Sequence, residues 1–191
     1  MPQRHEAVLD YLASRRTIPA KTYAGAVPSK AELEAILQTA IRVPDHGKLE
    51  PWRLVALDRA AMIRLADLAE ARARALQGDD EKIAKGRGQY DLGQLAVVVI
   101  ASPKPSEKIP ADEQLLSAGA LCMNILHAAN ASGWSACWLS GWPSHDATFR
   151  AEAFGCTEQE RIAGIIHIGT PKSEDMPDRP RPALSTILSW A

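Results

Sequence analysis

The sequence is poor in cysteine, in long apolar runs and in excess charge of either sign. Its three cysteines, Cys122, Cys137 and Cys156, are odd in number and lie in apolar stretches, so we expect reduced, buried thiols in a cytoplasmic protein. No apolar run is long enough to cross a bilayer, and no apolar segment follows the polar start, so we expect neither a membrane span nor a signal peptide.

The charge balance excludes two further classes of partner. Lysine and arginine number 22 and aspartate and glutamate 23, which gives a net charge of −1. Dedicated nucleic-acid binders and proteins held on acidic membranes carry a basic excess, so we expect neither role. The 191 residues, 46% of them hydrophobic, predict one folded domain over residues 1–191.

The motifs of several large enzyme classes are also missing. Gly86-Arg87-Gly88 lacks the third glycine of a dinucleotide-binding fingerprint and follows no strand. Gly164 and Gly169 have phosphate-loop spacing, but Thr170-Pro171 stands where Lys-Ser or Lys-Thr is required. The chain has no H-E-x-x-H, no cysteine pair with zinc spacing and no G-x-S-x-G. We therefore predict no metal site and no hydrolase or kinase chemistry.

The apolar patterns predict alternating helices and strands. The expected helices are residues 6–16, a helix behind the capping box at 29–32 that ends by Pro44, and residues 58–77, 112–132 and 144–154. The expected strands are residues 52–57, 95–100, 134–139 and 162–168. The long central helix and the few strands favour an α+β class with helices flanking the sheet.

Two segments are less regular. Residues 79–92 are polar and segregate their charges, which is typical of a solvated helix face or of a mobile lid over a pocket. Residues 157–160 (Thr-Glu-Gln-Glu) match a second capping box just before the last strand.

Two clusters of cationic and polar residues occur in the first third of the chain. Ser14-Arg15-Arg16-Thr17 offers two guanidinium groups and a hydroxyl, which suit an anion such as phosphate. The alternative is a charged helix end that offsets the helix dipole. The second cluster, residues 42–52 (Arg-Val-Pro-Asp-His-Gly-Lys-Leu-Glu-Pro-Trp), joins a helix to a strand and could direct hydrogen bonds at a ring-shaped ligand. Its alternative is a surface loop anchored in the core by Trp52.

Two more clusters follow later. Residues 138–143 (Trp-Leu-Ser-Gly-Trp-Pro) come after a strand, and their indole rings could form the wall of a flat pocket or pack one edge of the core. Residues 178–182 (Asp-Arg-Pro-Arg-Pro) could complete a phosphate site or solvate the tail.

These clusters, in this order, resemble the nitroreductase family of flavoproteins, and the minimal, YdjA-like branch of about 190 residues most closely. The resemblance extends over nearly the whole chain, and it rests on order and spacing more than on any single motif. The segments that carry it are Arg15-Arg16-Thr17, Arg42 to His46, Glu50-Pro51-Trp52, Ser117-Ala118-Gly119, Gly133-Trp134, Trp138 to Gly141, Glu152 to Cys156 and Ile168 to Pro171.

The resemblance implies an α+β, nitroreductase-like fold with a mixed or antiparallel sheet, and an intertwined homodimer with two FMN molecules in its interface. It implies reduction of nitroaromatic, quinone or similar small-molecule acceptors by a ping-pong mechanism, with NADPH or NADH as the donor. Because a flavin carries the redox chemistry itself, no side chain is assigned a catalytic role.

The resemblance also assigns residues. Arg15, Arg16 and Thr17 would hold the FMN phosphate and ribityl chain, Arg181 would add a phosphate contact from the tail, and Arg42 and His46 would reach the flavin of the other subunit. Trp138, Leu139 and Ser140 would line the flavin ring. The segment assigned to the nicotinamide nucleotide is Ala128, Ala129, Asn130, Ala131, Ser132 and Gly133.

The chain departs from the family pattern at three of these positions. Thr17 replaces the usual serine, Lys21 is the nearest basic residue after it, and Leu139 stands where close relatives carry arginine. Two other functions remain open: an FMN-carrying protein without reductase activity, and a flavin enzyme of another task, such as dehalogenation or flavin breakdown.

Overall fold

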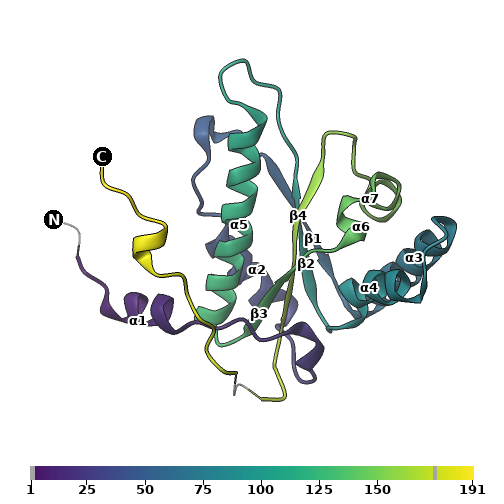
Figure 1. Cartoon of the computed structure of the whole chain (residues 1–191), viewed down its shortest axis with the longest axis horizontal. Helices are drawn as coiled ribbons and strands as arrows, with labels where there is room; N and C mark the ends of the chain where they lie inside the picture. Colours follow the sequence, from purple (N-terminus) through teal and green to yellow (C-terminus); the bar gives the residue numbers. More distant parts are fainter. Residues whose placement is uncertain (1–2, 174–175) are drawn as a thin grey trace.

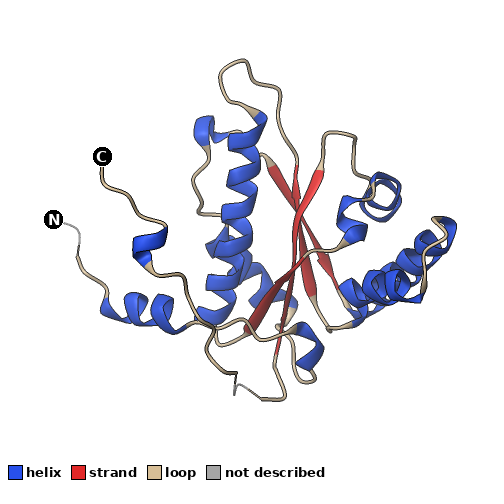
Figure 2. Cartoon of the chain, viewed as in Figure 1, coloured by secondary structure: helices blue, strands red, loops and turns tan. Residues whose placement is uncertain are grey.

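A computed structural model of the chain describes residues 3–173 and 176–191 (Figure 1). Four strands form one sheet, and helices cover both of its faces (Figure 2). The helices are α1 (Glu6–Ser14), α2 (Lys30–Ala40), α3 (Arg59–Ala75), α4 (Asp80–Asp91), α5 (Ala111–Ala131), α6 (Trp142–His145) and α7 (Ala147–Phe154). The strands are β1 (Trp52–Leu57), β2 (Ala96–Ala101), β3 (Ser135–Leu139) and β4 (Arg161–Gly169). Short 3₁₀ turns are η1 (Ala20–Thr22), η2 (His46–Lys48) and η3 (Leu184–Thr186).

The sheet is antiparallel throughout, in the order β1-β2-β4-β3. Strand β2 is central, and all six of its residues are buried, as its run of β-branched residues predicts. Because side chains alternate along a strand, Val97 and Val99 join one core and Val98 and Ile100 join the other. Strands β1 and β3 form the two edges. These observations confirm the predicted α+β class.

The two cores lie on opposite faces of the sheet. Helices α2 and α5 cover one face, where Leu121 and Ile125 of α5 are fully buried. Helices α3, α4, α6 and α7 lie over the other face, where Met62, Tyr90 and Phe149 are fully buried (Figure 2). The three cysteines are free and buried, as expected. Within the described ranges, no helix combines the length and the apolar content that a bilayer span requires.

Helix α1 and the C-terminal tail extend from the body on the same side (Figure 1). No residue of α1 is buried, and 91% of the Trp190 surface is exposed. Apolar side chains that a folded chain would normally cover are therefore exposed on both segments. They are Val8, Leu9 and Leu12 on α1, and Leu184, Ile187, Leu188 and Trp190 on the tail.

The capping box at the start of α2 is present as predicted. The Glu32 backbone N–H donates to the Ser29 hydroxyl, and the Ser29 N–H donates to the Glu32 carboxylate. The second predicted capping box, at residues 157–160, is wrong because no helix follows it. Its glutamate, Glu160, accepts the Thr157 N–H at 3.0 Å, but Arg53 of β1 binds both carboxylate oxygens, at 2.8 and 3.1 Å. The long-range ion pair takes the carboxylate that a helix start would need.

One further element differs from the expectation. The helix predicted at 144–154 is two helices, α6 and α7, because the Asp146 carboxylate accepts the Phe149 N–H and starts α7 afresh.

Residues 80–91 form the regular helix α4, in agreement with the helix-face interpretation of this segment. Arg87 fastens α4 to α3 through Asp67 and Glu70, both at 2.8 Å, and also pairs with Asp91 at 3.0 Å. The lid function of this segment stays a prediction, and these ion pairs are contacts that a lid would have to break.

The Arg53–Glu160 pair gives a pH-dependent prediction. Hydrogen bonds from Arg53 and Thr157 outweigh burial and lower the pKa of Glu160 from 4.5 to about 2. A carboxyl whose pKa is lower in the folded state stabilises the fold above its unfolded pKa, and this contribution is lost as the pH falls through the folded pKa. Urea unfolding at pH 7 should show Glu160→Gln to be less stable by about 2 to 3 kcal/mol, and the difference should shrink between pH 4.5 and 2.

The matched control for that prediction is Glu34→Gln, because Glu34 pairs with Lys30 only at the exposed surface. This change should cost less than about 0.5 kcal/mol. A Glu160→Gln deficit that stays constant down to pH 3 would show that the carboxylate charge is not what stabilises the pair.

The Arg87 network gives a second prediction. Arg87→Gln removes the charged link between α4 and α3, so amides 82–90 should exchange with deuterium roughly 10-fold faster while β2 stays protected. Arg74→Gln is the control, because Arg74 also binds Glu70 but belongs to α3 itself. Equal exchange in α4 for the wild type and Arg87→Gln would mean that apolar packing alone holds the helix.

Candidate functional site

Two segments far apart in the sequence meet in an arginine-rich cavity. Arg15, Arg16 and Thr17 follow α1 directly, and residues 179–181 of the tail return beside them. Together these residues line a cavity of about 330 Å³. The structure therefore brings the predicted phosphate residues of the first segment together with Arg181.

The tail is fastened to this cavity mainly through Arg16. Its Nε and Nη2 atoms donate to the Pro177 carbonyl at 3.1 and 2.8 Å. The exposed carboxylate of Asp178 lies 3.8 Å from Arg16 and 3.4 Å from Arg181. This carboxylate is the one acidic group paired with these arginines in the described part of the chain, so the cavity keeps a positive balance that suits an anion.

Arg15 retains an unused hydrogen-bond donor. Its Nη2 donates to the Thr17 hydroxyl at 3.4 Å, while its Nε is buried with no hydrogen-bond partner among the described residues. A buried donor without a partner costs free energy unless a ligand or water satisfies it. The guanidinium of Arg15 therefore fits a phosphate group, whose oxygens accept hydrogen bonds from such donors.

The end of β3 lies beside this cavity. Leu139 packs against a small buried cluster that contains Ile18, which directly follows the Arg15–Thr17 segment, and Met176 of the tail packs against the same cluster. The predicted ring-lining residue Leu139 and the residue after Thr17 thus belong to one apolar group. Lys21, in η1, is exposed and has no hydrogen bond or ion pair with any described residue.

The neighbours of Leu139 differ in exposure. Trp138 lies on the edge strand with 38% of its surface exposed, and its indole packs on Gly164, where an added Cβ would lie 2.3 Å from Nε1. Ser140 is exposed, with its hydroxyl 3.4 Å from Nε2 of His145. An indole and a hydroxyl at an open sheet edge can contact the face and the polar rim of a flat ring.

Sequence reasoning missed the residues of α4 that adjoin this edge. The Gln89 side chain lies against Gly141, where an added Cβ would approach it to 2.6 Å, and its Oε1 is buried without a partner in the described residues. The Gln89 carbonyl accepts a hydrogen bond from Nε2 of His167 at 3.0 Å. Burial lowers the pKa of His167 to about 4 although this bond opposes the shift, so the ring is neutral. Gly141 and His167, which Gln89 contacts, lie far from it in the sequence, so no local sequence pattern could have identified Gln89.

His46 lies at the other end of α5, whereas Arg42 lies beside Asn124, about one helical turn before His127. The Asn124 side chain donates to the Arg42 carbonyl at 3.3 Å, and Nδ1 of His46 lies 2.8 Å from Glu113 near the start of α5. Tyr11, which precedes the arginine cavity, instead contacts His127 near the end of α5. Fourteen helical residues separate Glu113 from His127, which is about 21 Å. Within one chain, His46 is therefore remote from the arginine cavity.

Residues 128–133 form the last turn of α5 and its end. Ala129 is fully buried, the Asn130 amide binds Tyr11 and the Trp134 carbonyl, and the Ser132 hydroxyl donates to the Ala128 carbonyl. Gly133 has φ +83°, which terminates the helix. These side chains serve the fold, and the assignment of the segment to the nicotinamide nucleotide stays a prediction.

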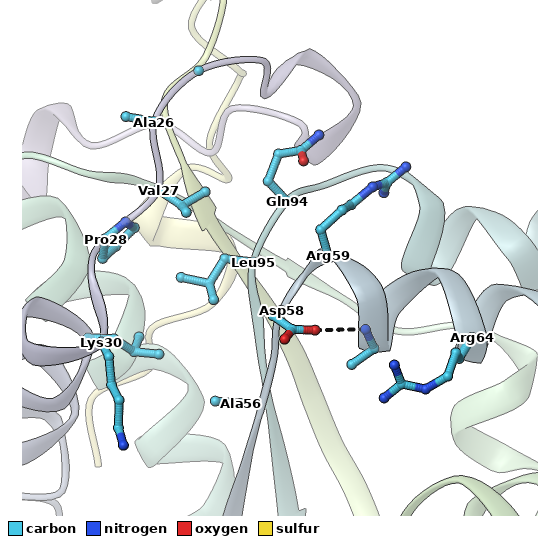
Figure 3. Close-up of a pocket in the computed structure, with 13 residues that line it drawn as sticks. Ala26, Val27, Pro28, Lys30, Ala56, Asp58, Arg59, Arg64, Gln94 and Leu95 are labelled. Atoms are coloured by element: carbon cyan, nitrogen blue, oxygen red, sulfur yellow. Dashed lines mark hydrogen bonds between the residues drawn. The ribbon is translucent and has the colours of Figure 1, made fainter.

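A larger cavity of about 900 Å³ lies elsewhere (Figure 3). It borders the open edge of β1, between residues 25–28 and the start of α3, and the cations Lys30 and Arg64 line it. Asp58 at its floor accepts the Ala61 N–H at 2.7 Å and caps α3. None of the predicted site residues lines this cavity.

Comparison with known sequences gives three matches of interest. The family model described as the Nitroreductase family matches residues 12–170. The Escherichia coli K12 protein named "Putative NAD(P)H nitroreductase YdjA" is 34% identical over 164 residues, which cover 86% of this chain and 88% of that protein. A similarly named Haemophilus influenzae protein is 34% identical over 145 residues, or 75% of this chain and 78% of that one.

Solved structures show the same fold. A nitroreductase-like family protein from Bacillus cereus superposes with a TM-score of 0.77 at 23% identity, over 100% of this chain and 99% of that one. A Bacteroides fragilis nitroreductase with bound FMN gives 0.75 at 20% identity, over 96% and 98%. The family match covers most of the chain and a curated relative exceeds 30% identity, so the chain belongs to the nitroreductase family.

Proposed function

We propose that the chain is an FMN-dependent NAD(P)H oxidoreductase that reduces nitroaromatic, quinone or similar acceptors and works as an intertwined homodimer. The observation that carries this proposal is the arginine cavity beside the end of β3. A cationic cavity and, on the nearby edge strand, a partly exposed indole beside Leu139 in the sequence match a ligand that is a phosphate at one end and a flat ring at the other. Family membership and the FMN found in the Bacteroides fragilis structure support the same ligand.

The residues present fit FMN at both ends. Arg15, Arg16, Thr17 and Arg181 would hold the phosphate, where the buried Nε of Arg15 offers a free donor. Trp138, Leu139 and Ser140 would line the ring. Phosphate binding by several guanidinium groups is strong because each hydrogen bond is charge-assisted.

When bound, FMN would supply the redox chemistry between NADPH or NADH and the acceptor, for which we propose a ping-pong order. The chain itself would bind FMN and orient its ring. Trp138 and Leu139 would shield parts of the ring from water, and the arginines would fix the phosphate so that the ring has one position. No nucleophile or acid–base pair is required of the protein, in keeping with the missing hydrolase and kinase motifs.

The dimer is supported by the separation of the predicted site residues. His46 pairs with Glu113, about 21 Å along α5 from the His127 that contacts Tyr11, so we assign His46 to the site of another copy. The Arg42 carbonyl lies beside Asn124, about one helical turn from His127, so the assignment of Arg42 to another copy rests on the family resemblance. Two α5 helices packed antiparallel about their midpoints would bring the His46 end of one copy beside the arginine end of the other. The free surface of α5 suits such packing: Leu116 is 72% exposed, and an added Cβ at Gly119 would meet no atom within 4 Å.

The projecting arm of each copy supports the intertwined form. The tail carries exposed Leu184, Ile187 and Trp190, which need a partner surface. The open edge of β1 offers one, because an edge strand has unpaired backbone groups and cavities of about 900 and 510 Å³ adjoin it. We propose that the tail of one copy covers the β1 edge of the other.

The shared site predicts complementation between two inactive variants. Arg16→Ala and Arg42→Ala should each weaken FMN binding by on the order of 10- to 100-fold, because each removes charge-assisted hydrogen bonds. Mixed and reassembled as a heterodimer, they should recover high affinity at half of the sites, since one site then receives Arg16 from one chain and Arg42 from the other. Titration of flavin fluorescence measures the fraction of tight sites.

The control for that experiment is each variant dimer reassembled alone, which should recover nothing. Sedimentation should find both variants dimeric. Absence of recovery in the heterodimer would place the whole site within one chain and refute the shared site.

The activity is tested by one spectrum. The protein loaded with FMN should be yellow, and NADPH or NADH under argon should bleach the flavin band, which a nitroaromatic or quinone should then restore. Bound flavin that neither donor bleaches would favour the flavin-carrying alternative. Bleaching without re-oxidation by these acceptors would favour another flavin-dependent task, such as dehalogenation or flavin breakdown. A colourless protein that takes up no FMN would refute the cofactor.

A further inference from the structure

Tyr11 joins helix α1 to the end of α5. Its hydroxyl donates to Oδ1 of Asn130 at 3.2 Å and lies 3.0 Å from Nδ1 of His127. The Tyr11 and His127 rings also meet edge to face, with centroids 5.5 Å apart and planes at 76°. Tyr11 is the one side chain of α1 that makes hydrogen bonds to another element of the described chain.

The hydrogen bonds of this group fix its protonation. Nδ2 of Asn130 donates to the Trp134 carbonyl at 2.8 Å, so the amide oxygen faces Tyr11. The phenol has a single proton, which it donates to that oxygen, and Nδ1 of His127 must therefore donate to the phenol. Burial and the nearby charge of Arg15 lower the pKa of His127, which keeps its ring neutral. Tyr11 is thus held by two neutral partners on the rigid α5.

Arg15 lies one helical turn after Tyr11. Its backbone N–H donates to the Tyr11 carbonyl at 2.8 Å, so it continues the same side of α1. The positive charge of its guanidinium opposes the rise that burial causes in the pKa of Tyr11, as expected for a side chain one turn along the same helix face. On its other side the guanidinium contacts Thr17. The phenol and the Thr17 hydroxyl therefore lie on either side of an arginine whose buried Nε has no partner in the described chain.

We propose that Tyr11 is a positioning residue of the phosphate site: supported by His127 and Asn130, it keeps the Arg15 guanidinium directed into the arginine cavity. The inference rests on the proposed function, because it takes the phosphate of FMN as the ligand. A flexible arginine loses conformational freedom when it binds, and a neighbour that already restricts it lowers that cost. The buried helix α5 thereby determines the geometry of a cavity at the surface.

The test compares FMN with riboflavin, which lacks the phosphate. Tyr11→Phe keeps the ring contact with His127 and removes only the hydroxyl. Its dissociation constant for FMN should rise roughly 5- to 10-fold, while that for riboflavin should not change. Tyr90→Phe is the matched control, because the Tyr90 hydroxyl is buried without a partner in the described chain and belongs to the opposite core. It should bind both ligands as the wild type does.

A double-mutant cycle tests whether Tyr11 affects FMN binding through Arg15. If Tyr11 acts through Arg15, Tyr11→Phe should cause no further loss of FMN affinity in an Arg15→Ala background. Equal losses with and without Arg15, or equal losses for FMN and riboflavin, would overturn the inference and leave Tyr11 as an ordinary packing contact.

The proposed function and the role of Tyr11 can be refuted independently of each other. A wild-type chain that binds no FMN refutes the proposed function, and inorganic phosphate then serves as the probe for Tyr11. Phosphate should raise the melting temperature of the wild type more than that of Tyr11→Phe. An equal rise in both, or none in either, would overturn the role of Tyr11.

Discussion

The burial of α5 against one face of the sheet is the contact on which the rest of the structure depends. Leu121 and Ile125 anchor the helix in the core, so neither end can shift without opening that core. The end near residue 113 holds the loop that carries His46, and the Ser117 hydroxyl, one turn further, accepts from Trp52 and donates to the Pro44 carbonyl. The end near residue 130 holds α1 through Tyr11. One rigid helix thus fixes both groups of predicted site residues and the distance between them.

The positive charge of the arginine cavity requires contacts that hold its arginines in place. Guanidinium groups gathered without an anion repel one another, and Asp178 offsets only part of this charge from an exposed position. The cavity persists because Arg16 is bound to the Pro177 carbonyl and Arg15 lies between Tyr11 and Thr17. A ligand phosphate would then enter a site already arranged for it, and binding would cost little rearrangement.

The sequence predicted those features that depend on neighbouring residues. The capping box at Ser29 and the buried strand β2 follow from a few adjacent side chains, and Arg15 and Arg16 indicate an anion by their chemistry alone. The same local pattern failed at Thr157, because Arg53, more than a hundred residues earlier, binds Glu160. The helix at 80–91 depends in the same way on Asp67 and Glu70 of α3.

The same difference between local and long-range features applies to the candidate site. Residue type identified the arginines and the indole, whereas Tyr11 and Gln89 act through partners 119 and 78 residues away, Asn130 and His167. No periodicity or motif records such a pairing, because it exists only once the chain has folded. The family resemblance supplied Arg42 and His46, which no contact within one chain would have assigned to this site.

In the proposed dimer, a site shared between two copies would link cofactor binding to assembly. A ligand that contacts Arg16 of one copy and Arg42 of another binds the dimer and not the separated chains. By mass action such a ligand stabilises the dimer, and dissociation of the dimer would release it. In the proposed dimer the exposed apolar residues of α1 and the tail would favour assembly as well, because burying Leu12, Ile187 and Trp190 on a partner removes apolar surface from water. Assembly would therefore complete the fold and the FMN site in a single step.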